Sequence, residues 1–235
     1  MKNMTLMQHF AEMRRRILWV LLIFVIAFFA GVYFAPQIQD FLTAPLLMVW
    51  PDGAMLYGGL SDGMMISLSL GFTFALFVSL PVLLWHVWAY VAPGLRDKER
   101  KFIWPFLIMS PILFVVGAAF AFYVLFPVVF KFFIDLNLSA PVPAMVMPAA
   151  RDYLGFAVGL LKVFGIAFQL PLIMVLLNRI GVLGRARVIQ MRRYAIVLIA
   201  VVAAVLTPPD VVSQILLALP LWLLFEVSIL FMRRD

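Results

Sequence analysis

The sequence predicts an all-α polytopic membrane protein with six transmembrane helices, both termini in the cytoplasm, and two short helices at the end of the chain. Hydrophobic residues make up 66% of the 235 residues and charged residues 12%, with a mean hydropathy of +1.12. Soluble domains are about half apolar and about a quarter charged. The apolar residues form long runs, and the basic residues fall in the short breaks between them. We therefore expect residues 1–235 to form a single integral membrane domain that is covered by lipid.

Four apolar runs are long enough to span a bilayer, which requires about 20 residues. They cover residues 17–35, 66–91, 103–134 and 153–178. The first run has no small-residue cleavage site before a polar mature domain, so we interpret it as a retained helix. The third run exceeds one straight span, and Pro105, Pro111 and Pro127 are positions where it can bend.

The last apolar stretch, residues 194–232, is too long for one helix and contains a break. Its interruption, Thr207-Pro208-Pro209-Asp210, predicts a tight hairpin, because consecutive prolines disfavour helix before them and lack N–H donors. The stretch then gives two helices, at about residues 194–206 and 213–232. The first is short of a normal span by about a third.

The basic residues predict the orientation, since cytoplasmic connections are enriched in Lys and Arg. Fifteen of the 18 basic residues fall on one side: Lys2, Arg14, Arg15 and Arg16; Arg96, Lys98, Arg100 and Lys101; Arg179, Arg185, Arg187, Arg192 and Arg193; Arg233 and Arg234. This side is expected to be cytoplasmic, with both termini on it. The outer connections, about residues 36–65 and 135–152, are expected to fold over the outer face as caps. The sequence leaves open whether either contains a short interfacial helix.

The sequence shows no catalytic or metal-binding pattern. There is no cysteine, and the two histidines, His9 and His86, are not at ligand spacing from each other or from a carboxylate. The net charge of +7 does not indicate nucleic-acid binding, because the basic residues are not gathered on a solvated domain. We therefore expect a protein that is not an enzyme and that uses no cofactor, metal or nucleic acid.

Five motifs, spaced in order along the chain, resemble the TatC family. They are HFAEMRRR at 9–16, Ala44-Pro45-Leu46, WAYVAPGL at 88–95 with Glu99-Arg100, Phe168-Gln169-Leu170-Pro171, and Leu206 to Val211 with Ser213-Gln214. TatC is the multispanning subunit of the twin-arginine translocase, which exports folded proteins. The resemblance covers nearly the whole chain.

The resemblance implies a receptor for twin-arginine signal peptides at the cytoplasmic face. The carboxylates that the family uses match Glu12 and Glu99, and carboxylates bind guanidinium groups through charge-assisted, often bidentate hydrogen bonds. Arg15, Tyr90 and Pro93 lie in the same motifs and are expected to help form the binding site. Energy would come from the proton-motive force, with no ATP.

The resemblance also implies the setting in which the protein works. The expected partners are twin-arginine signal peptides, small single-span TatA- and TatB-type subunits, and further copies of the chain within a hetero-complex in the lipid bilayer. The bacterial inner membrane is the expected location, with an organellar membrane as the alternative. Pro45, Pro208, Pro209 and Asp210 are expected to have structural roles on the outer face.

Three polar residues in apolar helices are candidates for intramembrane or partner-docking roles: Lys162, Gln169 and Glu226. The family usually has Glu where this chain has Gln169, Phe where it has Tyr90, and a Pro-x-Glu element that residues 60–64 lack. Lys162 precedes Gln169 by two helical turns and is expected to share its face and part of its polar role.

Simpler interpretations remain open for several of these residues. Glu226 can pair with a neighbour or extend to the interface. His86 can extend to the cytoplasmic interface or take part in a proton relay. Glu99 can stabilise a helix N-terminus, and Gly155-x-x-x-Gly159 is weak support for close helix packing. The alternative function is a proton-coupled secondary transporter with Lys162, Gln169 and Glu226 along its path.

Overall fold

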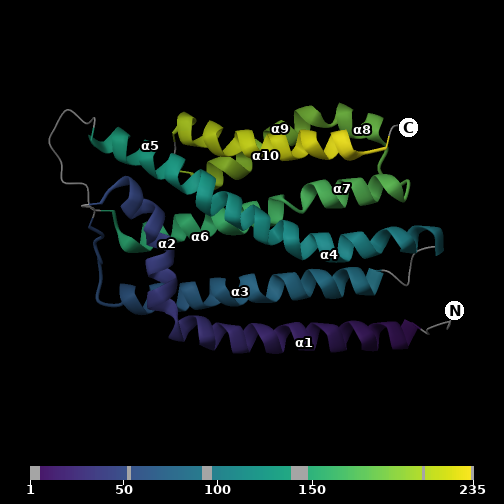
Figure 1. Cartoon of the computed structure of the whole chain (residues 1–235), viewed down its shortest axis with the longest axis horizontal. Helices are drawn as coiled ribbons and strands as arrows, with labels where there is room; N and C mark the ends of the chain where they lie inside the picture. Colours follow the sequence, from purple (N-terminus) through teal and green to yellow (C-terminus); the bar gives the residue numbers. More distant parts are fainter. Residues whose placement is uncertain (1–5, 52–53, 92–96, 139–147, 208–209, 234–235) are drawn as a thin grey trace. The chain divides into compact units, whose positions relative to one another are not determined.

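The computed structural model describes residues 6–51, 54–91, 97–138, 148–207 and 210–233. In these ranges the chain is helical and contains no β-strand (Figure 1), which confirms the predicted all-α fold. Residue contacts divide the chain into two units. Unit 1 comprises Met1–Ile38 and Gly63–Ile112, and unit 2 comprises Gln39–Asp62 and Leu113–Asp235. That the chain forms a single domain stays a prediction.

Unit 1 is built from α1 (Leu6–Tyr33), most of α3 (Asp62–Val91) and the first part of α4 (Asp97–Phe120). Two glycines allow α1 and α3 to approach closely. A Cβ atom on Gly71 would lie 2.4 Å from Cγ2 of Val32, and one on Gly31 would lie 2.9 Å from Cα of Gly71. Real side chains do not tolerate such distances, so glycine at both positions sets the spacing of the two helices.

Unit 2 holds the remaining helices, and α10 packs against both α7 and α9. Its elements after the end of α4 are η2 (Ala121–Leu125, π-helical), α5 (Phe126–Leu138), α6 (Ala150–Ala167), α7 (Leu170–Arg179), α8 (Arg185–Gln190), α9 (Arg192–Leu206) and α10 (Val211–Phe231). Aromatic rings fill the space between η2, α5 and α6. Phe126, Phe130 and Tyr153 form a continuous series with centroid separations of 5.3 and 4.7 Å.

Proline changes the hydrogen bonding of two predicted helices. Residues 103–134 form α4, η2 and α5, and η2 comes directly before Phe126-Pro127. Because Pro127 has no N–H, the carbonyl of Tyr123 loses its usual donor, and the π-helical turn accommodates the defect. Residues 153–178 likewise form α6 and α7, separated at Phe168–Gln169. Pro171 cannot donate to the carbonyl of Ala167, which explains the second interruption.

Five helical segments are long and apolar enough to cross a membrane in the part of the chain that the structure describes: Ala11–Tyr33, Asp62–Val87, Ile108–Leu136, Ala150–Arg179 and Val211–Phe231. They match five of the six expected spans. The remaining one, α9, has 15 residues and is about 22 Å long, less than the roughly 30 Å of a hydrocarbon core. A sixth span, and the orientation of all of them, stay predictions.

One helix, α2 (Ala35–Val49), lies in the first outer connection, where the sequence left open whether there is a short helix. Pro36 is at its second position, where a missing N–H costs nothing. Pro45 is buried in its interior. The Tyr153 hydroxyl of α6 donates a 2.8 Å hydrogen bond to the carbonyl of Leu42, and Phe41 stacks on Phe122 at 4.3 Å. These contacts hold α2 against the aromatic core of unit 2.

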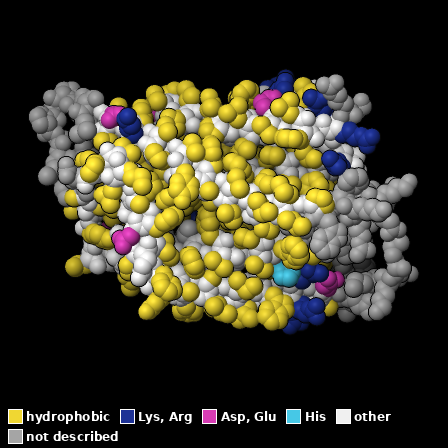
Figure 2. All heavy atoms as spheres, in the orientation of Figure 1, with side chains coloured by type: hydrophobic (Ala, Val, Ile, Leu, Met, Phe, Trp, Pro, Cys, Tyr) yellow, Lys and Arg dark blue, Asp and Glu magenta, His cyan; other side chains and the backbone are white. Residues whose placement is uncertain are grey.

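The two long connections meet within unit 2. Leu56 and Ala149 form an isolated parallel bridge, with N–H groups of Leu56 and Ala150 donating to carbonyls of Pro148 and Leu56. The first connection therefore contains a helix, and its end is hydrogen-bonded to the second. Along the helices the visible surface is hydrophobic, and charged side chains gather towards the helix ends (Figure 2).

Candidate functional site

Glu12, Arg16 and His86 form a hydrogen-bonded cluster at one end of unit 1. Nε and Nη2 of Arg16 donate to Oε1 of Glu12 at 3.0 and 2.5 Å, and Nη1 of Arg16 lies 3.3 Å from Nδ1 of His86. The side chains of Arg16 and Glu12 are 24% and 20% exposed. Arg16 therefore links α1 to α3, and His86 makes a specific contact in addition to lying near a helix end.

The other expected peptide-binding residues belong to the same end of unit 1. Arg15 is exposed on α1, and Tyr90 is partly buried in the last turn of α3. Glu99 lies in the first turn of α4, but its side chain is outside what the structure describes, as is Pro93. The start of α1, the end of α3 and the start of α4 lie at the same end of unit 1 in Figure 1. The fold therefore places the helix ends that flank the two predicted motifs at the same end of unit 1.

Lys162 and Gln169 differ in burial. Lys162 is partly buried on the side of α6 that also carries the exposed Gly155 and Ile166. Gln169 is only 6% exposed and lies in the turn between α6 and α7. The sequence predicted that Lys162 and Gln169 share one helical face, because they are two turns apart. Since the turn interrupts the helix, this spacing does not by itself place the two side chains on one face.

Glu226 pairs with Arg192, which decides between the two interpretations of this carboxylate. Nη2 of Arg192, at the start of α9, donates to Oε2 of Glu226 on α10 at 2.6 Å. Nearby, Nε of Arg185 donates to the carbonyl of Ile229 at 3.1 Å. Apolar side chains of α7, α8 and α10, with the residue that follows α10, form a buried cluster in the same unit: Met174, Val188, Phe225, Ile229 and Met232.

Asp210 caps the N-terminus of α10. Its Oδ1 accepts a 2.7 Å hydrogen bond from the backbone N–H of Ser213, and its Oδ2 accepts one from the Ser213 hydroxyl. Side-chain Nε2 of Gln214 donates to the carbonyl of Ala200 at 3.0 Å and ties α10 to α9. The contacts of Asp210 agree with a structural role. Pro208 and Pro209 lie outside the described residues.

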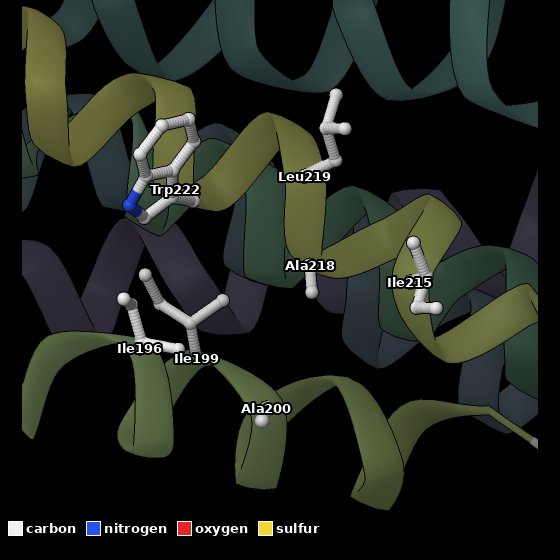
Figure 3. Close-up of a pocket in the computed structure, with 7 residues that line it drawn as sticks. All are labelled: Ile196, Ile199, Ala200, Ile215, Ala218, Leu219 and Trp222. Atoms are coloured by element: carbon white, nitrogen blue, oxygen red, sulfur yellow. The ribbon is translucent and has the colours of Figure 1, made fainter. Parts of the chain in front are cut away.

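An apolar groove of about 290 Å³ lies between α9 and α10 (Figure 3). The Gln214–Ala200 hydrogen bond joins the two helices at one end of the groove, and the Arg192–Glu226 ion pair joins them beyond the other. The groove is lined by Ile196, Ile199, Ala200, Ile215, Ala218, Leu219 and Trp222. Its lining offers no charged or hydroxyl side chain for a polar ligand.

Arg16 belongs to the candidate site, although the sequence motifs did not indicate it. The spacing of Glu12 and Arg16, four residues apart in a helix, was a usable signal for an ion pair. The first apolar run begins only at residue 17, however, so both residues fall before the first predicted helix. The contact of Arg16 with His86, 70 residues away, had no comparable signal, because it depends on how α1 packs against α3.

The chain matches the family model "Sec-independent protein translocase protein (TatC)" over residues 8–220. It is 38% identical to the protein of that name from Magnetococcus marinus over 229 residues, covering 97% of this chain and 83% of the relative. The Escherichia coli K12 protein of the same name is 37% identical over 229 residues, covering 97% and 88% of the two chains.

A solved structure agrees with these sequence comparisons. The fold matches a crystal structure described as the twin arginine translocase receptor TatC with a TM-score of 0.85 and 30% identity. The match covers 95% of this chain and 97% of that one. A second crystal structure of that receptor, in the detergent DDM, matches with a TM-score of 0.86 and 29% identity, covering 96% and 99% of the two chains.

Proposed function

The chain belongs to the TatC family of Sec-independent protein translocase proteins, and we propose that it is the receptor subunit that binds twin-arginine signal peptides. Membership of the family makes it a multi-pass protein of the bacterial inner membrane and a component of a translocase. The finer proposal is that Glu12 and Glu99 accept the paired arginines of the peptide at the cytoplasmic face.

The main support for the proposal is the Glu12–Arg16 contact itself. In it, a guanidinium group already binds Glu12 through two nitrogens, at 3.0 and 2.5 Å. The Glu12 carboxylate can therefore be reached by a guanidinium side chain, at a position only partly shielded from water. Charge-assisted hydrogen bonds of this kind are about twice as strong as neutral ones. The carboxylate of Glu99, at the start of α4 in the same unit, is proposed to take the second arginine.

The transporter alternative is less well supported. It needs Lys162, Gln169 and Glu226 along one path, but Glu226 forms an ion pair with Arg192 at the start of α9. We propose instead that Lys162 and Gln169 contribute to docking of the single-span TatA- and TatB-type partner subunits. Glu226 would then act indirectly, by holding α9 and α10 together.

Replacing both carboxylates tests the peptide-binding site. Glu12→Gln with Glu99→Gln keeps side-chain size and hydrogen bonding but removes the charges that two guanidinium groups require. We expect peptide affinity to fall by at least 10-fold, since each charge-assisted pair contributes about 1.5–3 kcal/mol. The measurement is crosslinking and binding of a twin-arginine peptide, together with export in cells and protein abundance. Full export and normal crosslinking by the double variant would show that the peptide binds elsewhere.

Lys162→Met separates a docking role from a structural one. The change removes a charge that is costly in lipid and keeps side-chain length, so the protein should insert and accumulate at least as well as the unchanged protein. If Lys162 docks a partner subunit, export should fall several-fold while binding of the signal peptide is retained. The measurement is export rate relative to membrane abundance. Unchanged export at normal abundance would leave Lys162 without a functional role.

A further inference from the structure

Arg16 makes the contacts to Glu12 that an arginine of a signal peptide would make. Its Nε and Nη2 both donate to Oε1 of Glu12, and Nη1 lies 3.3 Å from Nδ1 of His86. All three nitrogens of the guanidinium group are thus engaged within unit 1. Both partners are less than a quarter exposed, so the pair is shielded more than an ordinary surface ion pair.

We propose that Arg16 is an internal competitor of the signal peptide. In the peptide-free protein its guanidinium group occupies Glu12, an arginine of the peptide displaces it, and Arg16 returns when the peptide leaves. This inference rests on the proposed function, because it assumes that Glu12 accepts a peptide arginine.

Exchange of guanidinium groups limits how much Glu12 contributes to affinity. The Glu12–Arg16 contact is lost when the contact between Glu12 and the peptide arginine forms. The net gain in binding free energy is therefore smaller than it would be for an unoccupied carboxylate. Arg16 is four residues from Glu12 on the same helix, and His86 on α3 binds its third nitrogen. A displaced Arg16 therefore stays within reach of Glu12 and favours release of the peptide. A receptor that serves successive substrates needs such release.

A different arrangement would keep Arg16 in place. Both of its contacts go to Oε1 of Glu12, and a peptide arginine could bind Oε2 instead. Two guanidinium groups would then lie side by side in a partly shielded site, where like charges repel each other. Competition avoids this repulsion. The two arrangements predict opposite effects of removing Arg16. If Arg16 stays in place and positions Glu12 for the peptide, its loss should weaken peptide binding, whereas if Arg16 competes with the peptide, its loss should strengthen peptide binding.

The test measures binding of a fluorescent synthetic peptide, with paired arginines and an apolar segment, to the full chain in lipid nanodiscs. The variants are Arg16→Met, Arg16→Gln, Glu12→Gln and the double variant Glu12→Gln/Arg16→Met. Arg14→Met is the matched control, because Arg14 is an exposed residue of the same segment of α1 and its loss changes the net charge equally. Monodisperse elution and a helical circular dichroism spectrum establish that each variant is folded. If Arg16→Met does not fold, Arg16→Gln replaces it in the test.

Competition predicts that loss of Arg16 tightens peptide binding roughly 10-fold, which corresponds to one charge-assisted contact, with slower dissociation. Arg14→Met should give a clearly smaller change. In the Glu12→Gln background, removing Arg16 should have no more effect than Arg14→Met has in the unchanged protein. If peptide binding is weaker or unchanged on loss of Arg16, and is also weaker in Glu12→Gln, Arg16 is not a competitor. The proposal that Glu12 binds the peptide would then still hold. Equal peptide binding by Arg16→Met and by Glu12→Gln/Arg16→Met would instead reject Glu12 as a peptide-binding residue, and the competitor with it.

Discussion

Replacement of Gly117 by valine is expected to prevent accumulation of the folded protein. A Cβ atom at this position of α4 would lie 2.4 Å from the carbonyl oxygen of Phe164 and 2.9 Å from Cβ of Phe168. The nearest obstacle is backbone, which cannot rotate away as a side chain can. Even Gly117→Ala should therefore force α4 and α6 apart, at a cost of about 1–3 kcal/mol.

Two other glycines of unit 2 provide matched comparisons. A Cβ atom on Gly165 would lie 2.6 Å from the ring of Phe114, which can move, so Gly165→Ala should cost less than Gly117→Ala. A Cβ atom on Gly155 would have no described neighbour within 4 Å, so Gly155→Ala should be nearly neutral. The measurement is thermal unfolding of purified protein in detergent, with membrane abundance. Equal stability of the Gly117 and Gly155 alanine variants would show that the α4–α6 crossing does not require glycine.

Asp210→Ala is expected to lower the free energy of unfolding by about 1–2 kcal/mol. The substitution removes the two carboxylate acceptors of Ser213, a fully buried residue, and leaves its hydroxyl only the backbone carbonyl of residue 210, at 3.4 Å. It also removes a negative charge from the N-terminus of α10, where the helix dipole favours one. The hairpin of α9 and α10 should then open more easily, because the cap lies at the junction of the two helices.

Asp210→Asn is the control for this prediction. An asparagine keeps an acceptor for the backbone N–H of Ser213 and caps helices about as well as aspartate. We therefore expect Asp210→Asn to unfold within a few degrees of the unchanged protein and Asp210→Ala to unfold at a clearly lower temperature. Protease accessibility of the hairpin, measured in parallel, should increase for the alanine variant alone. Identical unfolding temperatures of the two variants would show that the Asp210 side chain does not stabilise the protein as a helix cap.

The glycines show where sequence reasoning fell short. Gly155-x-x-x-Gly159 is the spacing that indicates close packing in the sequence. Within the described residues, however, a Cβ atom on Gly155 would meet open space, and one on Gly159 would make only an ordinary contact, 3.6 Å from Leu206. The close approaches are at Gly31 and Gly71 in unit 1 and at Gly117 and Gly165 in unit 2. Spacing within one helix identifies a face on which another helix could pack. It carries no information about which helix packs there.

The sequence alone determined the fold class, five of the membrane-spanning segments, the break before α10 and the family. These properties depend on hydrophobicity summed over 20 or more residues, on prolines that act within one turn, and on motifs read along the chain. The tertiary structure decided that α2 packs on the aromatic core, that Glu226 pairs with Arg192, and that Arg16 joins Glu12 to His86. Each of these depends on contacts between residues 34 or more positions apart, and such contacts form only after the helices have packed in one particular arrangement.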